Sequence, residues 1–167
     1  MKTLLIARHA KSSWNDASKN DFERGLNPRG QKDAPLMASY LQQCGYMVNQ
    51  IISSDAVRAL ETAEQYKKYL TPEHDLITYH DLYLAPLNSI IQLVKNIPQS
   101  EAVVMLVGHN PGMSEALNYW SGENMDDMPT CGVGIIQFDI NSWAEAEASQ
   151  GSLLGFEHPK SIQDKSH

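Results

Sequence analysis

Short stretches of consecutive apolar residues constrain the fold of this chain more than any other feature of its sequence. Five of them have the length of a β-strand, and most are continuously apolar rather than alternating with polar residues. Continuous runs are typical of strands that are covered on both faces, as in mainly parallel sheets. The five runs occupy residues 3–7, 50–53, 76–78, 102–107 and 133–140.

Amphipathic segments lie between these runs and predict four helices. Each has apolar residues spaced three and four apart and a recognisable start or end, such as a proline at the first turn. A regular alternation of strands and helices predicts a three-layer α/β/α sandwich with a mostly parallel central sheet. After Gly132, residues 133–140 and 152–156 predict an antiparallel edge. The four helices are expected to begin near Pro28, Asp55, Leu87 and Pro111.

The length of 167 residues fits one domain, and no segment resembles a linker. We therefore expect a single domain over residues 1–167, with a disordered tail from about residue 160. The opening apolar stretch is interrupted by Arg8 and His9 well before the length of a signal peptide or a membrane span. The sequence therefore predicts a cytoplasmic protein with no membrane partner.

The charge of the chain is acidic overall, with a formal net charge of −7. Because clustered Lys and Arg supply most of the attraction to nucleic acid, this balance argues against a nucleic-acid partner. The few arginines are distributed unevenly, since all four lie within the first 58 residues. They are Arg8, Arg24, Arg29 and Arg58.

Cationic and imidazole side chains follow three of the predicted strands at the points where the strands end. Arg8 and His9 follow the first strand, His109 follows the strand at 102–107, and Arg58 lies at the start of the helix after the strand at 50–53. In open α/β sheets, ligands bind beyond the carboxyl ends of the strands, where helix N-termini also present free N–H groups. If these strands are neighbours, their ends form an anion site.

Each of these residues also has an ordinary structural explanation. His9 could be a buried, hydrogen-bonded histidine, His109 part of a strand-to-helix turn, and Arg58 an exposed helix cation. However, burying the guanidinium of Arg8 without a partner costs several kcal/mol. The pairing of Arg8 with His9, and of His9 with His109, therefore favours a functional site.

A metal site is the main chemical alternative for two histidines. Arg8 and Arg58 would repel a divalent cation, and no acidic residue has ligand-type spacing from either histidine. Cys44 and Cys131 also lack metal-ligand spacing, and we expect them to be reduced thiols. Two arginines can grip a phosphoryl group with forked hydrogen bonds, so we favour phosphate over metal.

Five segments, taken in this order, resemble the histidine phosphatase superfamily, specifically its SixA-like phosphohistidine phosphatase branch. The resemblance spans nearly the whole chain and implies a phosphoglycerate-mutase-like fold. An Arg-His pair alone would be a weak signal, but its combination with a later RAxxTA and a GH pair is specific. The segments are ARHAKSSW (7–14), DFERGLNPRG (21–30), SSDAVRALETA (53–63), GHNPG (108–112) and MPTCGVGIIQFD (128–139).

The resemblance implies a role for each motif residue. His9 is the nucleophile that becomes phosphorylated, while Arg8, Arg58 and His109 hold the phosphoryl group. Arg24 is implied as a further phosphate contact. No metal or other cofactor is implied.

The general acid that protonates the leaving group is less clearly marked. By resemblance Asp21 is the first candidate and Asp81 the second. Each could instead be a helix cap or loop carboxylate, and for Asp81 we favour that ordinary explanation. Two positions depart from the common family pattern, which often has proline where this chain has Gly25 and glutamine where it has Glu61. We expect Gly25 to loosen the loop of Asp21, and Glu61 to compete mildly for Arg58.

The sequence thus predicts a hydrolase that works in two steps, attack by His9 and then hydrolysis of the phosphohistidine by water. Its predicted substrate is a phosphorylated protein carrying phosphohistidine, because the chain has no sizeable helical insertion to roof the site. Two alternatives stay open: the same chemistry on a small phosphorylated metabolite, and a phosphoryl-binding module without turnover. No prediction is made for the oligomeric state.

Overall fold

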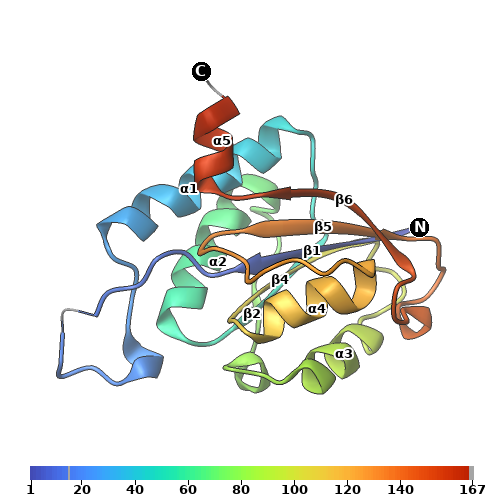
Figure 1. Cartoon of the computed structure of the whole chain (residues 1–167), viewed down its shortest axis with the longest axis horizontal. Coiled ribbons are helices and arrows are strands. Elements are labelled where there is room, and N and C mark those ends of the chain that lie inside the picture. Colours follow the sequence, from blue (N-terminus) through green and yellow to red (C-terminus); the bar gives the residue numbers. More distant parts are fainter. Residues whose placement is uncertain (15, 166–167) are drawn as a thin grey trace.

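The structure, a computed structural model, describes residues 1–14 and 16–165. At the centre of this part of the chain, six strands form a single sheet (Figure 1). Each predicted apolar run forms a strand, and both ends of each strand lie within two residues of the predicted ends. The strands are β1 (Lys2–Arg8), β2 (Gln50–Ser54), β3 (Ile77–Tyr79), β4 (Val103–Gly108), β5 (Val133–Phe138) and β6 (Gly151–Glu157).

The sheet order is β3-β2-β4-β1-β5-β6. The pairs β3–β2, β2–β4 and β4–β1 are parallel, whereas β5 is antiparallel to both β1 and β6. The expected mostly parallel sheet with antiparallel pairing after Gly132 is therefore confirmed. Strands β1, β2 and β4 are neighbours, which places the ends that carry Arg8, His9 and His109 at one edge of the sheet.

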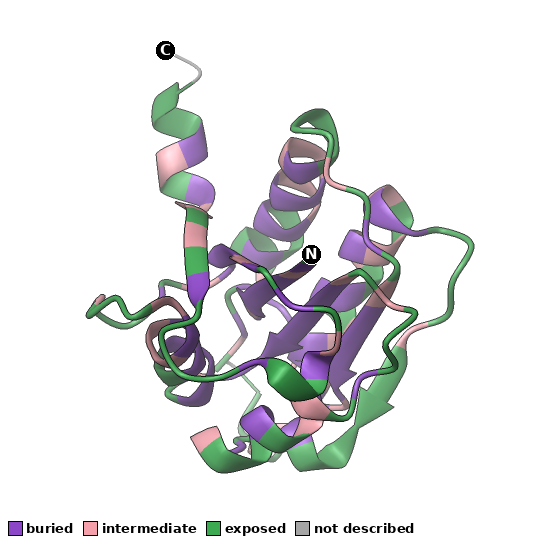
Figure 2. Ribbon diagram, turned by 90° about the vertical axis from the view of Figure 1, so that its right-hand side faces the viewer, coloured by how far each residue is buried: buried purple, intermediate pink, exposed green. Residues whose placement is uncertain are grey.

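Helices cover both faces of this sheet, which confirms the three-layer sandwich (Figure 1). Side chains alternate along β1, so that Leu4 and Ile6 pack into one core while Leu5 and Ala7 pack into the other. Figure 2 shows the central strands as buried, with exposed residues on the outer sides of the helices. One face carries α1 (Pro28–Gln43) and α2 (Val57–Leu70), and the other carries α3 (Leu87–Lys95) and α4 (Gly112–Ser121).

The C-terminal segment differs from the expected disordered tail. Helix α5 (Pro159–Lys165) covers most of it, and residues 166–167 lie outside the described residues. The side chain of Ile162 is buried in the core that α1 and α2 share, and α5 packs on α1. The burial of Pro159 and Ile162 explains why the segment is ordered. Two buried residues in a short polar stretch give little periodic signal, so the sequence analysis did not predict this helix.

The described helices also bear on membrane association. Within residues 1–14 and 16–165, every helix is too short or too polar to cross a bilayer.

Candidate active site

The pairing of β1 with β4 brings the two histidines of the sequence motifs together. Arg8 and Gly108 are register partners, so His9 and His109 leave their strands at the same level. The backbone N–H of His9 donates to the carbonyl of Gly108 at 3.1 Å. The ring centroids of His9 and His109 consequently lie 5.1 Å apart.

The imidazole of His9 is held in one orientation. Its Nδ1 lies 2.7 Å from the carbonyl oxygen of Ala10. Because a carbonyl can only accept, the ring proton sits on Nδ1 and the lone pair sits on Nε2. That nitrogen accepts a hydrogen bond from Nε of Arg58 at 3.3 Å. Burial lowers the pKa of His9 to about 4, and nearby arginines add to the shift, so the ring is neutral at pH 7.

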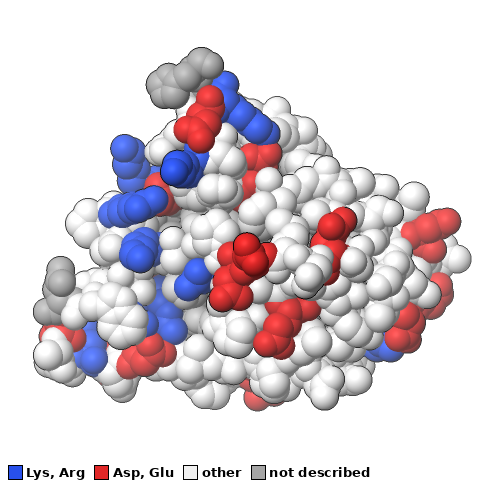
Figure 3. All heavy atoms as spheres, in the orientation of Figure 1, with Lys and Arg blue, Asp and Glu red and all other residues white. Residues whose placement is uncertain are grey.

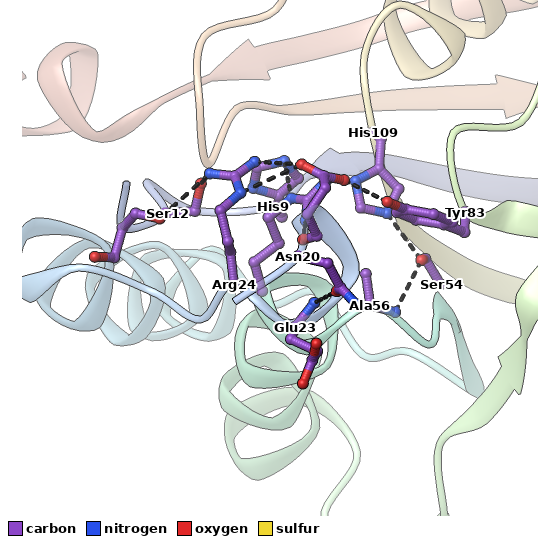
Figure 4. A network of polar contacts seen from close by, with 12 residues as sticks. His9, Ser12, Asn20, Glu23, Arg24, Ser54, Ala56, Tyr83 and His109 are labelled. Atoms are coloured by element: carbon purple, nitrogen blue, oxygen red, sulfur yellow. Dashed lines mark hydrogen bonds and ion pairs between the residues drawn. The ribbon is translucent and has the colours of Figure 1, made fainter. Parts of the chain in front are cut away.

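His109 is also a buried, neutral imidazole, 3% exposed. Its Nε2 lies 2.8 Å from Oγ of Ser54, which itself accepts the backbone N–H of Ala56 (Figure 4). The hydroxyl proton of Ser54 can then point to Nε2, which leaves the ring proton of His109 on Nδ1. Burial, with contributions from His9 and Arg58, lowers the pKa of His109 to about 3.

Two buried nitrogen donors of the site have no hydrogen-bond partner among the described residues. They are Nδ1 of His109 and Nε of Arg8. The other end of the Arg8 guanidinium is fixed, since its Nη1 donates to the carbonyl of Met128 at 2.8 Å. Buried donors are almost always paired in native proteins. Two unpaired donors beside His9 therefore indicate a site that an anion fills.

Arg58 comes from the first turn of α2 and connects the histidines to the segment between β1 and α1. Its Nη1 donates to the backbone carbonyl of Asp21 at 2.6 Å, and its Nη2 contacts Oδ2 of the same residue at 3.0 Å. Thr62, one turn further along α2, donates to the carbonyl of Arg58 and accepts the N–H of Ala10. Helix α2 thus positions both Arg58 and the residue after His9.

Asp21 and Arg24 lie at opposite ends of the short 3-10 helix η1 (Asp21–Glu23), which Asn20 caps by accepting the N–H of Glu23 (Figure 4). Nη2 of Arg24 contacts Oδ1 of Asp21 at 2.6 Å, and its Nη1 donates to Oγ of Ser12 at 2.9 Å. The guanidinium of Arg24 also stacks on the ring of Trp14 at 3.4 Å. Arg24 is therefore buried and fixed from three sides.

All six residues that the sequence analysis assigned to the site line one cavity of about 260 Å³. The sequence analysis missed the other residues that line it. Most of them lie inside the quoted motifs, so the motifs contained a signal for them, but Leu84 lies in no motif. These residues are Lys11, Ser12, Trp14, Leu84, Asn110 and Thr130.

The second candidate acid, Asp81, is placed elsewhere. It is exposed and lines a separate cavity between β3 and α3. Tyr83, two residues later in the chain, faces the site instead, and its hydroxyl donates to Oδ2 of Asp21. Sequence reasoning gave no signal for Tyr83, which lies 62 residues from Asp21.

The two departures from the family pattern are connected in the structure. The carboxylate of Glu61 accepts a hydrogen bond from the backbone N–H of Leu26 at 3.0 Å. Among the described residues, Arg58 forms its ion pair with Asp21 and not with Glu61. The expected competition for Arg58 is therefore absent from this structure. A Cβ atom at Gly25 would lie 2.5 Å from Oε1 of Glu61, so the glycine leaves room for this contact.

Comparison with known proteins identifies the family of this chain. A sequence profile of the histidine phosphatase superfamily (branch 1) matches residues 4–82. An uncharacterised chloroplastic protein of Arabidopsis thaliana is 33% identical over 161 residues, which cover 90% of this chain and 72% of that protein. The chain belongs to the histidine phosphatase superfamily. Phosphatases, after which this superfamily is named, are hydrolases, which agrees with the predicted enzyme class.

Solved structures of histidine phosphatases share the fold of the whole chain. SixA from Agrobacterium tumefaciens is 27% identical with a TM-score of 0.82, covering 95% of this chain and 98% of that one. The protein histidine phosphatase SixA in complex with tungstate is 19% identical with a TM-score of 0.80, covering 96% and 99%. The phosphoglycerate-mutase-like fold predicted for this histidine phosphatase is thus confirmed.

Proposed function

We propose that this protein is a phosphatase that works without a metal, forms a phosphohistidine on His9 and acts on phosphohistidine in proteins. The observation that carries the proposal is the state of His9. Its proton is on Nδ1, bound to the carbonyl of Ala10, and its Nε2 lone pair faces Arg58 in an anion site. A neutral, oriented imidazole beside guanidinium groups is suited to attack phosphorus.

In the first step, Nε2 of His9 attacks the phosphorus atom and the leaving group departs. The phosphoryl oxygens accept hydrogen bonds from Arg8, Arg58 and His109, including the two donors that lack a partner. Arg24 adds a further contact from η1. These fixed donors stabilise the charge that the oxygens carry in the transition state, without reorganisation during the reaction. The same guanidinium groups disfavour a divalent cation at this place.

In the second step, water attacks the phosphorus atom of the phosphohistidine. Nε2 recovers its lone pair, both protons of the water stay with the released phosphate, and Nδ1 keeps its proton throughout. Neither step requires the hydrogen bond from Nδ1–H to the carbonyl of Ala10 to break. His9 therefore returns to its starting state without a proton shuttle of its own.

The size of the cavity supports a substrate whose bulk lies outside it. At about 260 Å³ it is smaller than the roughly 300–1,000 Å³ of sites that enclose a small ligand. Trp14 and Leu84 stand at the cavity with 74% and 54% of their surface exposed. An open cavity that holds the phosphoryl group, with exposed apolar side chains beside it, suits a loop of a phosphorylated protein.

The decisive experiment compares the wild-type protein with His9→Ala, using an aryl phosphate in the presence of a chelator. We expect acid-labile phosphate on the wild-type protein by mass spectrometry, and neither label nor turnover on His9→Ala. His74→Ala is a matched control, because His74 is exposed and lies beyond the C-terminal end of α2, away from Arg58. Normal turnover by His9→Ala would exclude the mechanism.

The substrate class has its own test. A phosphorylated protein and a panel of sugar and nucleotide phosphates are compared by kcat/KM. Preference for the protein supports the proposal, and preference for one small phosphate assigns the alternative substrate.

A further inference from the structure

The carboxylate of Asp21 is surrounded by hydrogen-bond donors. Its Oδ1 accepts from Nε and Nη2 of Arg24 at 3.3 and 2.6 Å. Its Oδ2 accepts from Nη2 of Arg58 at 3.0 Å and from the hydroxyl of Tyr83, whose ring lies beside His109 (Figure 4). Four donors on two oxygens, three of them from the two guanidinium groups, match the ionised form of a carboxyl group.

The protonation states agree with this contact pattern. Partial burial opposes ionisation of Asp21, but the hydrogen bonds from Tyr83, Arg24 and Arg58 outweigh it and hold its pKa well below the usual range. Burial and the contact with Asp21 raise the pKa of Tyr83, so its phenol keeps its proton and remains a donor. Asp21 therefore has no proton to give near neutral pH.

Backbone contacts keep Asp21 in place even if phosphoryl oxygens draw guanidinium donors away from its carboxylate. Nη1 of Arg58 and the N–H of Arg24 both donate to the backbone carbonyl of Asp21. Tyr83 is held by edge-to-face ring contacts with Phe22 and His109, at centroid distances of 5.2 and 5.5 Å. The hydroxyl of Tyr83 thus stays within reach of Asp21.

We propose that Tyr83 and the two guanidinium groups keep Asp21 as a carboxylate, so that this site cleaves phosphoryl bonds whose leaving group needs no proton from the enzyme. The preferred substrates are then phosphorylated imidazoles and activated aryl phosphates, and alkyl phosphate esters are poor substrates. This inference rests on the proposed function. It gives Asp21 a role different from the proton donor that the family resemblance implies: Asp21 is a positioning residue that orders Arg24 and Arg58.

Phosphohistidine can supply the proton of its own leaving group. An imidazole titrates near pH 6.5, so the ring nitrogen that does not carry phosphorus is partly protonated near neutral pH. When Nε2 of His9 forms its bond to phosphorus, the P–N bond of the substrate breaks and its electron pair returns to the ring. The ring leaves as a neutral imidazole. The group that gives up the phosphoryl group and the group that receives it are then both imidazoles, and no acid of the enzyme takes part.

Alkyl esters behave differently because the bridging oxygen must be protonated as the bond breaks. An aliphatic hydroxyl holds its proton about as tightly as water, with a pKa of about 15.7 for bulk water. A phenol is far more acidic, at about 10, and electron-withdrawing substituents lower this further. Without an acid, the rate should therefore fall as the leaving group becomes more basic.

The test is a series of aryl phosphates and two alkyl phosphates, with kcat/KM and the rate of His9 phosphorylation measured for each. We expect both to fall steadily as the pKa of the leaving group rises. Alkyl phosphates should react at least about 100-fold more slowly than the activated aryl phosphates, the lower end of what acid catalysis contributes. Equal rates across the series would overturn the inference.

Variants of Asp21 and Tyr83 separate the two roles. Asp21→Asn should keep the steep dependence on the leaving group, whatever its absolute rate. A selective loss on the most basic leaving groups would instead identify Asp21 as the acid. Tyr83→Phe removes one donor from Asp21 and should raise the alkyl-to-aryl ratio of kcat/KM about 10-fold or more, part of the acid-catalysis range.

Tyr79→Phe is the matched control for Tyr83→Phe, because Tyr79 lines the separate cavity between β3 and α3. Its alkyl-to-aryl ratio should equal that of the wild type. An unchanged ratio in Tyr83→Phe would remove Tyr83 from the inference. Failure of the proposed function would look different, since no substrate would then phosphorylate His9.

Discussion

The buried imidazole of His9, the proposed nucleophile, shows how its surroundings can prepare an ordinary residue for attack on phosphorus. An exposed histidine is half protonated near pH 6.5, and a protonated ring cannot attack. Here burial and the neighbouring arginines lower the pKa of His9 to about 4, and the carbonyl of Ala10 selects the reactive nitrogen. Few contacts are needed for this, because guanidinium groups suited to bind phosphate also disfavour protonation of the neighbouring imidazole.

The titration of His9 can be measured directly. We expect its ring proton resonance in NMR spectra, assigned by comparison with His9→Gln, to shift with a midpoint near pH 4. A midpoint near pH 6.5 would mean that the ring is hydrated or ion-paired in solution. His74, which is exposed, serves as an internal reference in the same spectra.

The same shift predicts how stability depends on pH. The unfolded chain binds a proton at His9 below about pH 6.5, whereas the folded protein does so only near pH 4. The unfolded state therefore holds more protons between these values, and stability is lost as pH falls from 6.5 toward 4. The loss is on the order of 3 kcal/mol. Urea unfolding of His9→Gln should show a shallower loss over this interval, and an identical pH dependence would contradict the assignment.

Arg58 shows why charge alone does not account for the site. Its guanidinium contacts Nε2 of His9 and both the carbonyl and carboxylate of Asp21. Lysine at this position keeps the charge but cannot donate in three fixed directions. We expect Arg58→Lys to lower kcat about 100-fold or more, as removal of a transition-state donor does. Arg29→Lys, an exposed position on α1, should retain wild-type kinetics; equal losses in both variants would refute this reasoning.

At the scale of elements, the N-terminus of α1 packs directly on the segment that follows His9. A Cβ atom at Gly30 would lie 2.1 Å from the carbonyl oxygen of Lys11, which also accepts the N–H of Asn27. Backbone meets backbone at this contact, so neither side can move independently. Any side chain at position 30 must push α1 away from the segment that carries Lys11 and Ser12.

We therefore expect Gly30→Ala to destabilise the protein by about 1–3 kcal/mol, the usual cost of overpacking. Alanine favours a helix over glycine by up to about 1 kcal/mol, so a stabilised variant would show that the contact relaxes freely. Thermal unfolding measures the change. Lys32→Ala, exposed on the same helix, is the control and should leave the unfolding temperature nearly unchanged.

The strands and the positions of the two histidines could be predicted because each apolar run ends at its motif. Arg8 and Gly108, the last residues of β1 and β4, are register partners, so two ends that look alike in sequence also meet in space. The loop segments between helices and strands gave less indication of where their side chains would lie. Asp21 was assigned by family resemblance, and no pattern indicated which atoms its carboxylate would contact.

Tyr83 and Asp81 show the physical reason for this limit. Asp81 lies in the 3-10 helix η2 (His80–Leu82), and Tyr83 follows it two positions later. In such a tight turn, side chains two apart point in different directions, so Tyr83 reaches Asp21 while Asp81 lines the other cavity. A three-residue turn has no periodicity from which this choice could be inferred.

At the scale of the whole molecule, charged side chains are unevenly distributed over one face. On the face that Figure 3 shows, most of the visible Lys and Arg side chains lie on the side of α1 and the segment after β1, whereas most of the visible Asp and Glu side chains lie toward the middle and the opposite end. The cavity of the site is lined by four cationic side chains and one carboxylate. A protein with a net charge of −7 thus presents a locally positive surface to its substrate.

The effect of salt on kcat/KM can therefore show whether the net charge or the cations that line the cavity control the encounter with an anionic substrate. If the net charge controlled the encounter, salt would screen repulsion and raise kcat/KM for an anionic phosphate. If the lining cations control it, salt should lower kcat/KM, because screening acts within about 10 Å at 0.1 M. We expect kcat/KM to decrease as salt is added.

Two lysine variants test which cations are responsible. Lys11→Gln, exposed at the cavity, should weaken the salt dependence, whereas Lys95→Gln on α3 should not, since Lys95 is paired with Glu147. An increase of kcat/KM with salt would show that the local field is too weak to overcome the acidic remainder of the surface.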